Sequence, residues 1–133
     1  MWQPAKGYQI QDAWPVIYMP ESPINAYFDY RLYEQTGDPR YQRAAEILRE
    51  QLLSQPRNSD GGFWHKAMYP HQMWLDGIYM ASTFLVEYGR RFNEPEACHE
   101  AVRQIELIYS HTRDARTGLL YHAWDEARSR SEE

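Results

Sequence analysis

The sequence predicts an all-α protein built from helical hairpins. Two stretches carry apolar residues at the three- and four-residue spacing of one helical face. Two short turns, each followed by a helix-opening proline, lie 56 residues apart from Pro39 to Pro95. Strand signals are sparse. A hairpin repeated at this period favours a repeat array whose neighbours cover one another's apolar faces, although a four-helix bundle would show the same pattern.

The first predicted hairpin spans about residues 23–53. Ser22 is suited to cap its first helix, and Pro23 then occupies the first helical position. Gly37 ends that helix, and Asp38 opens the second helix by the same combination of cap and proline. The apolar face of the second helix consists of Tyr41, Ala44, Ala45, Leu48 and Leu52.

The second predicted hairpin spans about residues 72–112. Its first helix is expected from residue 72 to residue 91, and Glu94 with the following proline opens the second helix. Gly118 then marks a turn, after which residues 119–124 are expected to be extended. The charged tail, residues 125–133, is expected to fray. The apolar face of the last helix consists of Ala97, Ala101, Ile105 and Ile108.

Composition excludes several classes of partner. The net charge of −5 and the pI near 5.5 leave no basic footprint for nucleic acid or an anionic membrane. No segment reaches the ~18 consecutive apolar residues of a membrane helix. A single cysteine, Cys98, cannot form an internal disulfide, and the first residues lack the pattern of a secretory signal. We therefore expect a cytoplasmic protein without nucleic-acid or membrane partners.

The chain is unusually rich in aromatic residues. Eleven Tyr, five Trp and four Phe make up 15% of it, yet the mean hydropathy is only −0.80. Aromatic rings with polar groups suit sugar-binding clefts, because a ring stacks on the C–H face of a pyranose while its N–H or O–H bonds a hydroxyl. A core rich in tyrosine would give the same composition, so both interpretations stay open.

Residues 61–84 concentrate the chemically useful side chains. A glycine pair opens a loop with aromatic, histidine and lysine residues, and a helix with Asp76 near its start follows. Asp76 is flanked by Trp74, Leu75 and Ile78; such surroundings raise the pKa of a carboxyl group and suit it to act as a general acid. Alternatively, Asp76 complements the positive end of the helix, which would lower its pKa.

The histidines allow several roles. His65 and His71 lack cysteine or carboxylate partners at the usual metal-site spacing, so neither a metal nor another cofactor is expected. Hydrogen bonding to a substrate or to Asp76 suits them better. His111 lies in the last turn of its helix and is expected to favour the negative helix end. His122 follows the predicted turn and is either a structural histidine or part of a site.

These residues resemble the unsaturated rhamnogalacturonyl hydrolases, which are glycoside hydrolases of family 105 related to the unsaturated glucuronyl hydrolases of family 88. The resemblance covers about residues 27–126. It is carried by the motifs Gly61-Gly62-Phe63-Trp64-His65-Lys66, Tyr69-Pro70, Gln72-Met73-Trp74-Leu75-Asp76-Gly77, Tyr79-Met80-Ala81, Thr117-Gly118-Leu119-Leu120-Tyr121-His122 and Trp124-Asp125-Glu126.

The resemblance implies that residues 1–133 are one partial domain of an (α/α)6 barrel. It also implies an activity on oligosaccharides that end in a 4,5-unsaturated uronic acid, whose C4=C5 double bond such enzymes hydrate. Asp76 matches the catalytic acid, Lys66 is suited to contact the uronate carboxylate, and Trp74 is suited to stack on the sugar. The matching substrate-binding positions are Trp64, His65, Lys66, Trp74 and His122.

The sequence also departs from that family in two respects. Glu21 stands roughly where a second active-site aspartate is expected, within a stretch that otherwise matches poorly. The chain ends before a downstream segment that completes the pocket, so we expect weak or no activity from it alone. We also expect self-association through unpaired helical faces. A non-catalytic helical module that binds saccharide or protein through its aromatic groove is the alternative.

Overall fold

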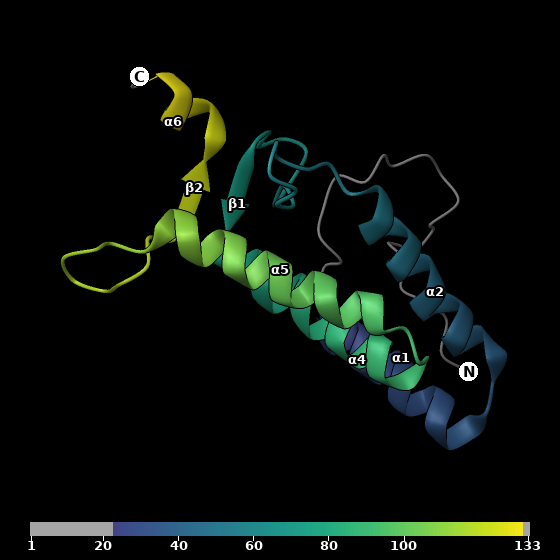
Figure 1. The fold of residues 1–133 in the computed structure, drawn as a ribbon. Helices are drawn as coiled ribbons and strands as arrows, with labels where there is room; N and C mark the ends of the chain where they lie inside the picture. Colours follow the sequence, from purple (N-terminus) through teal and green to yellow (C-terminus); the bar gives the residue numbers. More distant parts are fainter. Residues whose placement is uncertain (1–22, 132–133) are drawn as a thin grey trace.

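The computed structural model describes residues 23–131, so Glu21 lies outside the described residues. Helical segments predominate, and two short strands accompany them (Figure 1). The described residues include no helix that is long and apolar enough to cross a membrane. The elements are α1 (Pro23–Thr36), α2 (Pro39–Ser54), β1 (Gln72–Trp74), α3 (Leu75–Gly77), a π-helix η1 (Ile78–Ser82), α4 (Thr83–Arg91), α5 (Pro95–Thr112), β2 (Ala123–Asp125) and α6 (Glu126–Ser131).

The turn between α1 and α2 forms as predicted. Gly37 adopts a φ of 65°, where glycine has no steric penalty, and its N–H donates to the Tyr33 carbonyl oxygen at 2.8 Å. The Asp38 carboxylate accepts from the Arg40 N–H at 2.9 Å and caps α2. Pro39 occupies the first helical turn, where its missing N–H is not needed.

The second hairpin brings α4 and α5 side by side along most of their length (Figure 1). Asn93, at a φ of 54°, turns the chain between them. Gly89 permits the close approach, because a Cβ there would lie 2.6 Å from the Cys98 sulfur and 2.7 Å from the Glu94 carbonyl oxygen. Helix α5 begins at Pro95, one residue after Glu94, as predicted.

The start of the second hairpin differs from the prediction. Residues 72–74 form strand β1 rather than the first helical turn, and helical backbone begins only at Leu75. β1 pairs antiparallel with β2, and Met73 lies opposite Trp124. The first residues of the expected helix are extended because β2, about 50 residues later, supplies a strand partner that local sequence does not reveal.

The tail also differs from the expected frayed end. Asp125 belongs to β2, and residues 126–131 form α6. Residues 132–133 lie outside the described residues. Glu126 is buried, and its carboxylate accepts from the Ser59 hydroxyl and backbone N–H. These contacts hold the tail against the loop that precedes β1.

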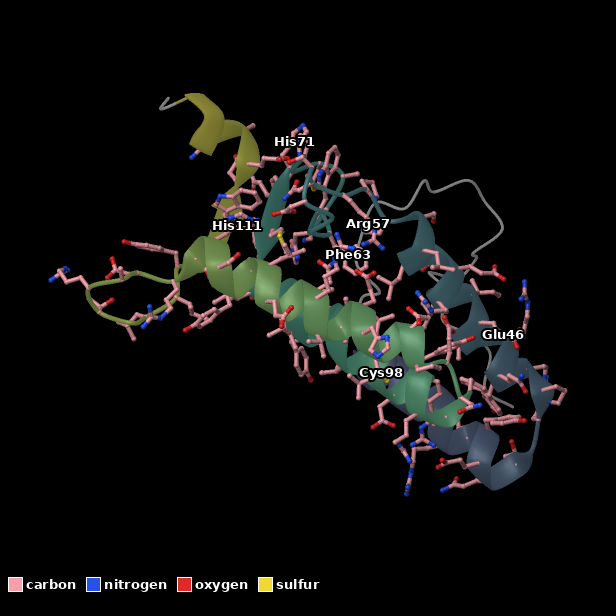
Figure 2. The ribbon with its side chains drawn as sticks, in the orientation of Figure 1. Glu46, Arg57, Phe63, His71, Cys98 and His111 are labelled. Atoms are coloured by element: carbon pink, nitrogen blue, oxygen red, sulfur yellow. The ribbon has the colours of Figure 1, made fainter. Side chains whose placement is uncertain are left out.

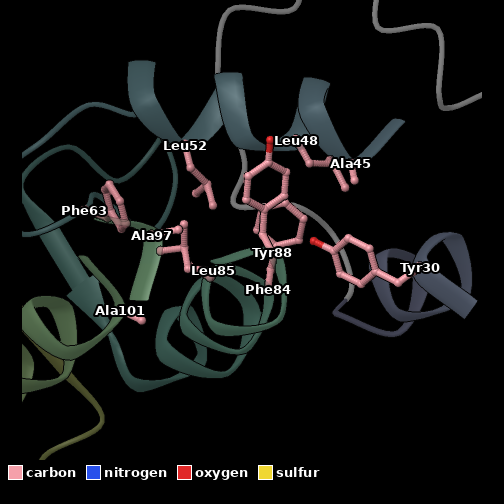
Figure 3. Packing of buried hydrophobic residues seen from close by; sticks show 11 residues of the cluster. Tyr30, Ala45, Leu48, Leu52, Phe63, Phe84, Leu85, Tyr88, Ala97 and Ala101 are labelled. Atoms are coloured by element: carbon pink, nitrogen blue, oxygen red, sulfur yellow. The ribbon is translucent and has the colours of Figure 1, made fainter. Parts of the chain in front are cut away.

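The core lies between α2, α4 and the beginning of α5 and reaches α1 (Figure 3). The rings of Tyr30 and Phe84 stack at a centroid distance of 5.9 Å, and Tyr88 lies 5.7 Å from Phe84. Part of the aromatic content therefore fills the core. The buried cluster consists of Tyr30, Ala45, Leu48, Leu52, Phe63, Ala81, Phe84, Leu85, Tyr88, Ala97 and Ala101.

An apolar stripe remains exposed across η1, α4 and α5. The Cys98 sulfur lies 3.8 Å from the Val86 carbonyl oxygen, and the Ser82 hydroxyl donates to the Ala101 carbonyl oxygen at 3.4 Å. This antiparallel register places the exposed side chains of the two helices alongside one another. The stripe consists of Tyr79, Val86, Val102, Ile105 and Tyr109.

Leu85 and Val86 provide a matched test of this packing. Replacing the fully buried Leu85 with alanine should reduce the free energy of unfolding by about 2–5 kcal/mol, because a cavity remains. Val86→Ala, at the exposed neighbour, should change it by no more than about 0.5 kcal/mol. Urea denaturation followed by circular dichroism measures both, and equal losses would contradict the assigned core.

Self-association through the apolar stripe is the second prediction from the fold. Sedimentation velocity should show dimers or larger species whose proportion rises with concentration, because association removes Val102, Ile105 and Tyr109 from water. Ile105→Glu should shift the distribution towards monomer, and Ser110→Glu, on a polar side of α5, should not. A wild-type chain that stays monomeric and binds no apolar dye would contradict the prediction.

Candidate active site

The glycine pair shapes the loop that leads into the site. Gly61 has a φ of 97°, and a Cβ on Gly62 would lie 2.2 Å from the Met73 sulfur, so β1 packs closely against this loop. The Asn58 N–H donates to the Gly62 carbonyl oxygen at 2.8 Å. The Asp60 carboxylate accepts from the Gly62 N–H at 3.0 Å. Backbone and side chain together close a compact turn.

His111 ties this turn to the end of α5. His111 lies near the end of α5 that faces β2 (Figure 2). Its Nε2 lies 2.5 Å from the Asp60 carboxylate, and its ring stacks on Trp124 at a centroid distance of 3.6 Å. Partial burial raises the pKa of Asp60, but the hydrogen bonds from His111 and Gly62 outweigh this effect and hold it below its usual value. His111 therefore connects the loop, α5 and β2, in addition to its predicted position at a helix end.

Three rings stack in parallel at the centre of the site. Trp74 stacks with His65, at a centroid distance of 4.6 Å, and with Tyr69, at 5.3 Å, with interplanar angles of 5° and 16°. The indole N–H of Trp74 donates to the Gln72 side-chain oxygen at 3.0 Å. Trp74 therefore packs against two neighbouring rings of the site.

Asp76 and His122 meet beside this stack. His122 Nε2 lies 4.0 Å from Asp76 Oδ1, and the His122 ring meets the edge of Trp74 at a centroid distance of 5.4 Å. The Leu75 N–H donates to the His122 carbonyl oxygen at 2.9 Å, which joins the two backbones. The structure thus brings together the predicted acid and a histidine that lies 46 positions further along the chain.

The surroundings of Asp76 differ from those that the sequence predicts. Its side chain is 56% exposed, and that of His122 is 61% exposed. The described residues therefore do not provide the apolar enclosure from which a protonated carboxyl was inferred. Asp76 does lie in the first turn of α3, where its charge complements the helix end, as in the alternative interpretation.

His65 is the buried member of the site, with 3% of its surface exposed. Burial lowers its pKa most, and the positive charge of Lys66 lowers it further, while Asp76 acts in the opposite direction. His65 is therefore neutral near pH 7. Because the charges of Lys66, Asp76 and His122 all act on His65, these four groups form one electrostatic cluster.

Trp64 and His71 lie apart from this cluster. Their rings contact each other at a centroid distance of 4.7 Å, and His71 Nδ1 is 3.6 Å from the Glu126 carboxylate. Within residues 23–131, no group of three or more metal-ligating side chains comes together. His71 therefore contacts Glu126 of the tail and not Asp76.

The structure adds two residues to those that sequence reasoning singled out. Tyr69 covers one face of Trp74, and Gln104 of α5 lies beneath the loop that carries His65. Tyr69 falls inside the recognised motif, and this was the sequence signal that could have identified it. Gln104 gave no such signal, because it is a polar residue on the apolar side of a helix.

Comparison with known proteins identifies a common family. Residues 21–132 match the Glycosyl Hydrolase Family 88. Over 100 residues the chain is 32% identical to the unsaturated rhamnogalacturonyl hydrolase YesR of Bacillus subtilis (strain 168), a match that covers 71% of this chain and 29% of that protein. The chain thus spans less than a third of the length of this relative.

Solved structures show the same relationship. A glycoside hydrolase from family 105 of C. acetobutylicum ATCC 824 superposes with a TM-score of 0.73 at 38% identity, over 78% of this chain and 29% of that one. A possible member of the same family from Klebsiella pneumoniae gives a TM-score of 0.70 at 30% identity, over 77% and 28%. The predicted helical fold, part of an (α/α)6 barrel, is confirmed.

The state of His65 can be tested by NMR titration. Its imidazole should titrate below the value of about 6.5 found for an unstructured peptide, because burial and Lys66 disfavour the cation. At a pH between the pKa values of His65 in the folded and unfolded chains, only the unfolded chain binds this proton. His65 therefore lowers the free energy of unfolding as the pH falls below about 6.5.

Two substitutions at Lys66 isolate the effect of its charge. Lys66→Gln should raise the pKa of His65, whereas Lys66→Arg, which keeps the charge, should leave it nearly unchanged. A wild-type His65 that titrates like the peptide would show that the imidazole is not buried in the described position.

Proposed function

Because the chain belongs to glycosyl hydrolase family 88, we propose that its site acts on oligosaccharides that end in a 4,5-unsaturated uronic acid. The observation that carries this proposal is the cluster of Asp76, His122 and neutral His65 beside Lys66. The cluster combines the Asp76 carboxyl group, which can transfer a proton, with the Lys66 cation, which can bind the uronate carboxylate. The relative YesR, which is named an unsaturated rhamnogalacturonyl hydrolase, supports the choice of substrate class.

In the proposed reaction, Asp76 acts first as an acid. Its carboxyl proton goes to C4 of the uronate, and the electrons of the C4=C5 double bond form the new C–H bond. The positive charge at C5 is shared with the ring oxygen. Water then adds to C5 and returns a proton to the Asp76 carboxylate. The resulting hemiketal opens, and the attached sugar is released.

The neighbouring groups of Asp76 have separate tasks in this proposal. Lys66 contacts the uronate carboxylate, and neutral His65 offers hydrogen bonds without adding a second positive charge. His122 lies close enough to Asp76 to exchange a hydrogen bond with it after a small movement. Trp74 keeps His65 and His122 in place through its ring contacts.

The exposure of Asp76 favours a second candidate function for this chain. A carboxyl group that is more than half exposed competes with water for its proton and gains little from electrostatic preorganisation. A chain that binds the saccharide at Lys66 and His65 without turning it over would be a binding module. For the same reason we expect a catalysed rate well below that of an enclosed site.

Loss of the ultraviolet absorbance of an unsaturated disaccharide distinguishes the two functions. If the chain is a hydrolase, the absorbance should fall with time, and Asp76→Asn should reduce the rate by on the order of 10²–10⁴, because the proton donor is lost. Glu106→Gln, which removes an exposed carboxylate of α5, should leave the rate unchanged.

Tryptophan fluorescence provides the complementary measurement. A saccharide-dependent change in fluorescence without loss of absorbance would reject hydrolysis by this chain and support the binding module. Turnover that survives Asp76→Asn would reject Asp76 as the acid. No fluorescence change and no turnover would reject both functions.

A further inference from the structure

Gln104 is a polar side chain of α5 that is almost completely buried, with 1% of its surface exposed. It occupies a position on the side of α5 that otherwise carries Ala97, Ala101 and Ile108. An apolar residue would suit this position by helical periodicity. Burying an amide there would cost free energy unless its hydrogen bonds were satisfied.

The Gln104 amide satisfies those hydrogen bonds with the backbone of the glycine loop. Its oxygen accepts from the Phe63 N–H at 2.8 Å, and its Nε2 donates to the Gly61 carbonyl oxygen at 2.9 Å. A neighbouring β-strand would offer the same pair of groups. The side chain therefore holds the loop as a strand would, from a helix where backbone groups are already paired with each other.

The orientation of the amide is set from the other side by Glu100. Gln104 Nε2 also donates to the Glu100 carboxylate at 2.7 Å, and Arg57 forms an ion pair with that carboxylate at 2.9 Å. Burial raises the pKa of Glu100, but the hydrogen bonds from Arg57 and Gln104 outweigh it and keep the group ionised. An ionised Glu100 carboxylate only accepts hydrogen bonds, so the Gln104 Nε2 must face it. The amide oxygen of Gln104 must then face the Phe63 N–H.

The position of Gln104 reaches the site through close packing. Together with Phe63, His65, Met73 and Trp74 it lines a cavity of about 10 Å³, which leaves room for at most one water molecule. Phe63 is only two residues from His65 and three from Lys66. A displacement of the loop at Phe63 would therefore move His65 against the Trp74 ring.

We propose that Gln104 is a positioning residue for the site. By pairing with Gly61 and Phe63, it fixes His65 and Lys66 relative to Asp76 without touching the substrate. The effect on His65 does not require the chain to be an enzyme. Only the consequence for turnover rests on the proposed function.

Gln104→Met tests this role because it keeps a long, uncharged side chain and removes both hydrogen bonds. The Phe63 amide should exchange its hydrogen at least about tenfold faster, and the pKa of His65 should rise towards the peptide value as the loop moves. The Leu85 amide serves as the internal reference, since its exchange should change much less. Gln51→Met, the same replacement in α2, should leave the Phe63 amide and His65 unchanged.

A paired substitution separates positioning from a general loss of stability. Gln104→Glu places a carboxylate against Glu100 and should accelerate exchange at Phe63 even though an oxygen still faces that N–H. Adding Glu100→Gln restores a donor–acceptor pair in the opposite order, and Arg57 can still donate to the Gly61 carbonyl oxygen. Protection of Phe63 should largely return in the double variant.

The proposal is overturned if Gln104→Met leaves Phe63 exchange and the His65 titration unchanged. It also fails if Leu85 accelerates as much as Phe63, or if the double variant is no better protected than Gln104→Glu. Turnover is measured in parallel on the unsaturated disaccharide. Altered exchange and titration in a chain that never turns over substrate would uphold the positioning role while rejecting the hydrolase proposal.

Discussion

The packing of α5 against the continuous helical stretch of η1 and α4 is the contact on which the rest of the structure depends. Gly89 and Ala97 let the two helices approach closely at one end of the hairpin. Further along, α5 directs Gln104 and His111 at the loop that contains the glycine pair. One helix thus contributes to the apolar core and also supplies the polar groups that hold the site. Small residues serve the first task, and buried hydrogen-bonding groups serve the second.

The aromatic residues divide between two purposes for a related physical reason. In the core, Tyr30, Phe84 and Tyr88 bury large apolar surfaces between helices. At the site, Trp74 stacks with both His65 and Tyr69. Aromatic residues therefore fill part of the core and also pack against one another at the candidate site. Asp76 and His122 beside them are each more than half exposed.

Local sequence was sufficient to predict helices α1, α2, α4 and α5, but not strand β1 or helix α6. The Asp38 cap and the prolines after each turn act within a few residues, so their effects do not depend on the rest of the chain. Residues 72–74 are different, because they are extended only through pairing with residues 123–125. The tail was misjudged for the same reason: Glu126 is held by Ser59, which lies 67 positions earlier in the sequence.

The sequence by itself determined the hairpin order, the turn positions and, through its motifs, the family and the residues from which a site would be built. The tertiary structure decided how those residues are used. It placed Asp76 beside His122, stacked Trp74 with His65 and brought Trp64 against His71. It also left Asp76 exposed. Burial and ring contacts depend on segments that are distant in the chain, whereas caps and helical periodicity depend on neighbours, and this difference in range separates what could be predicted from what could not.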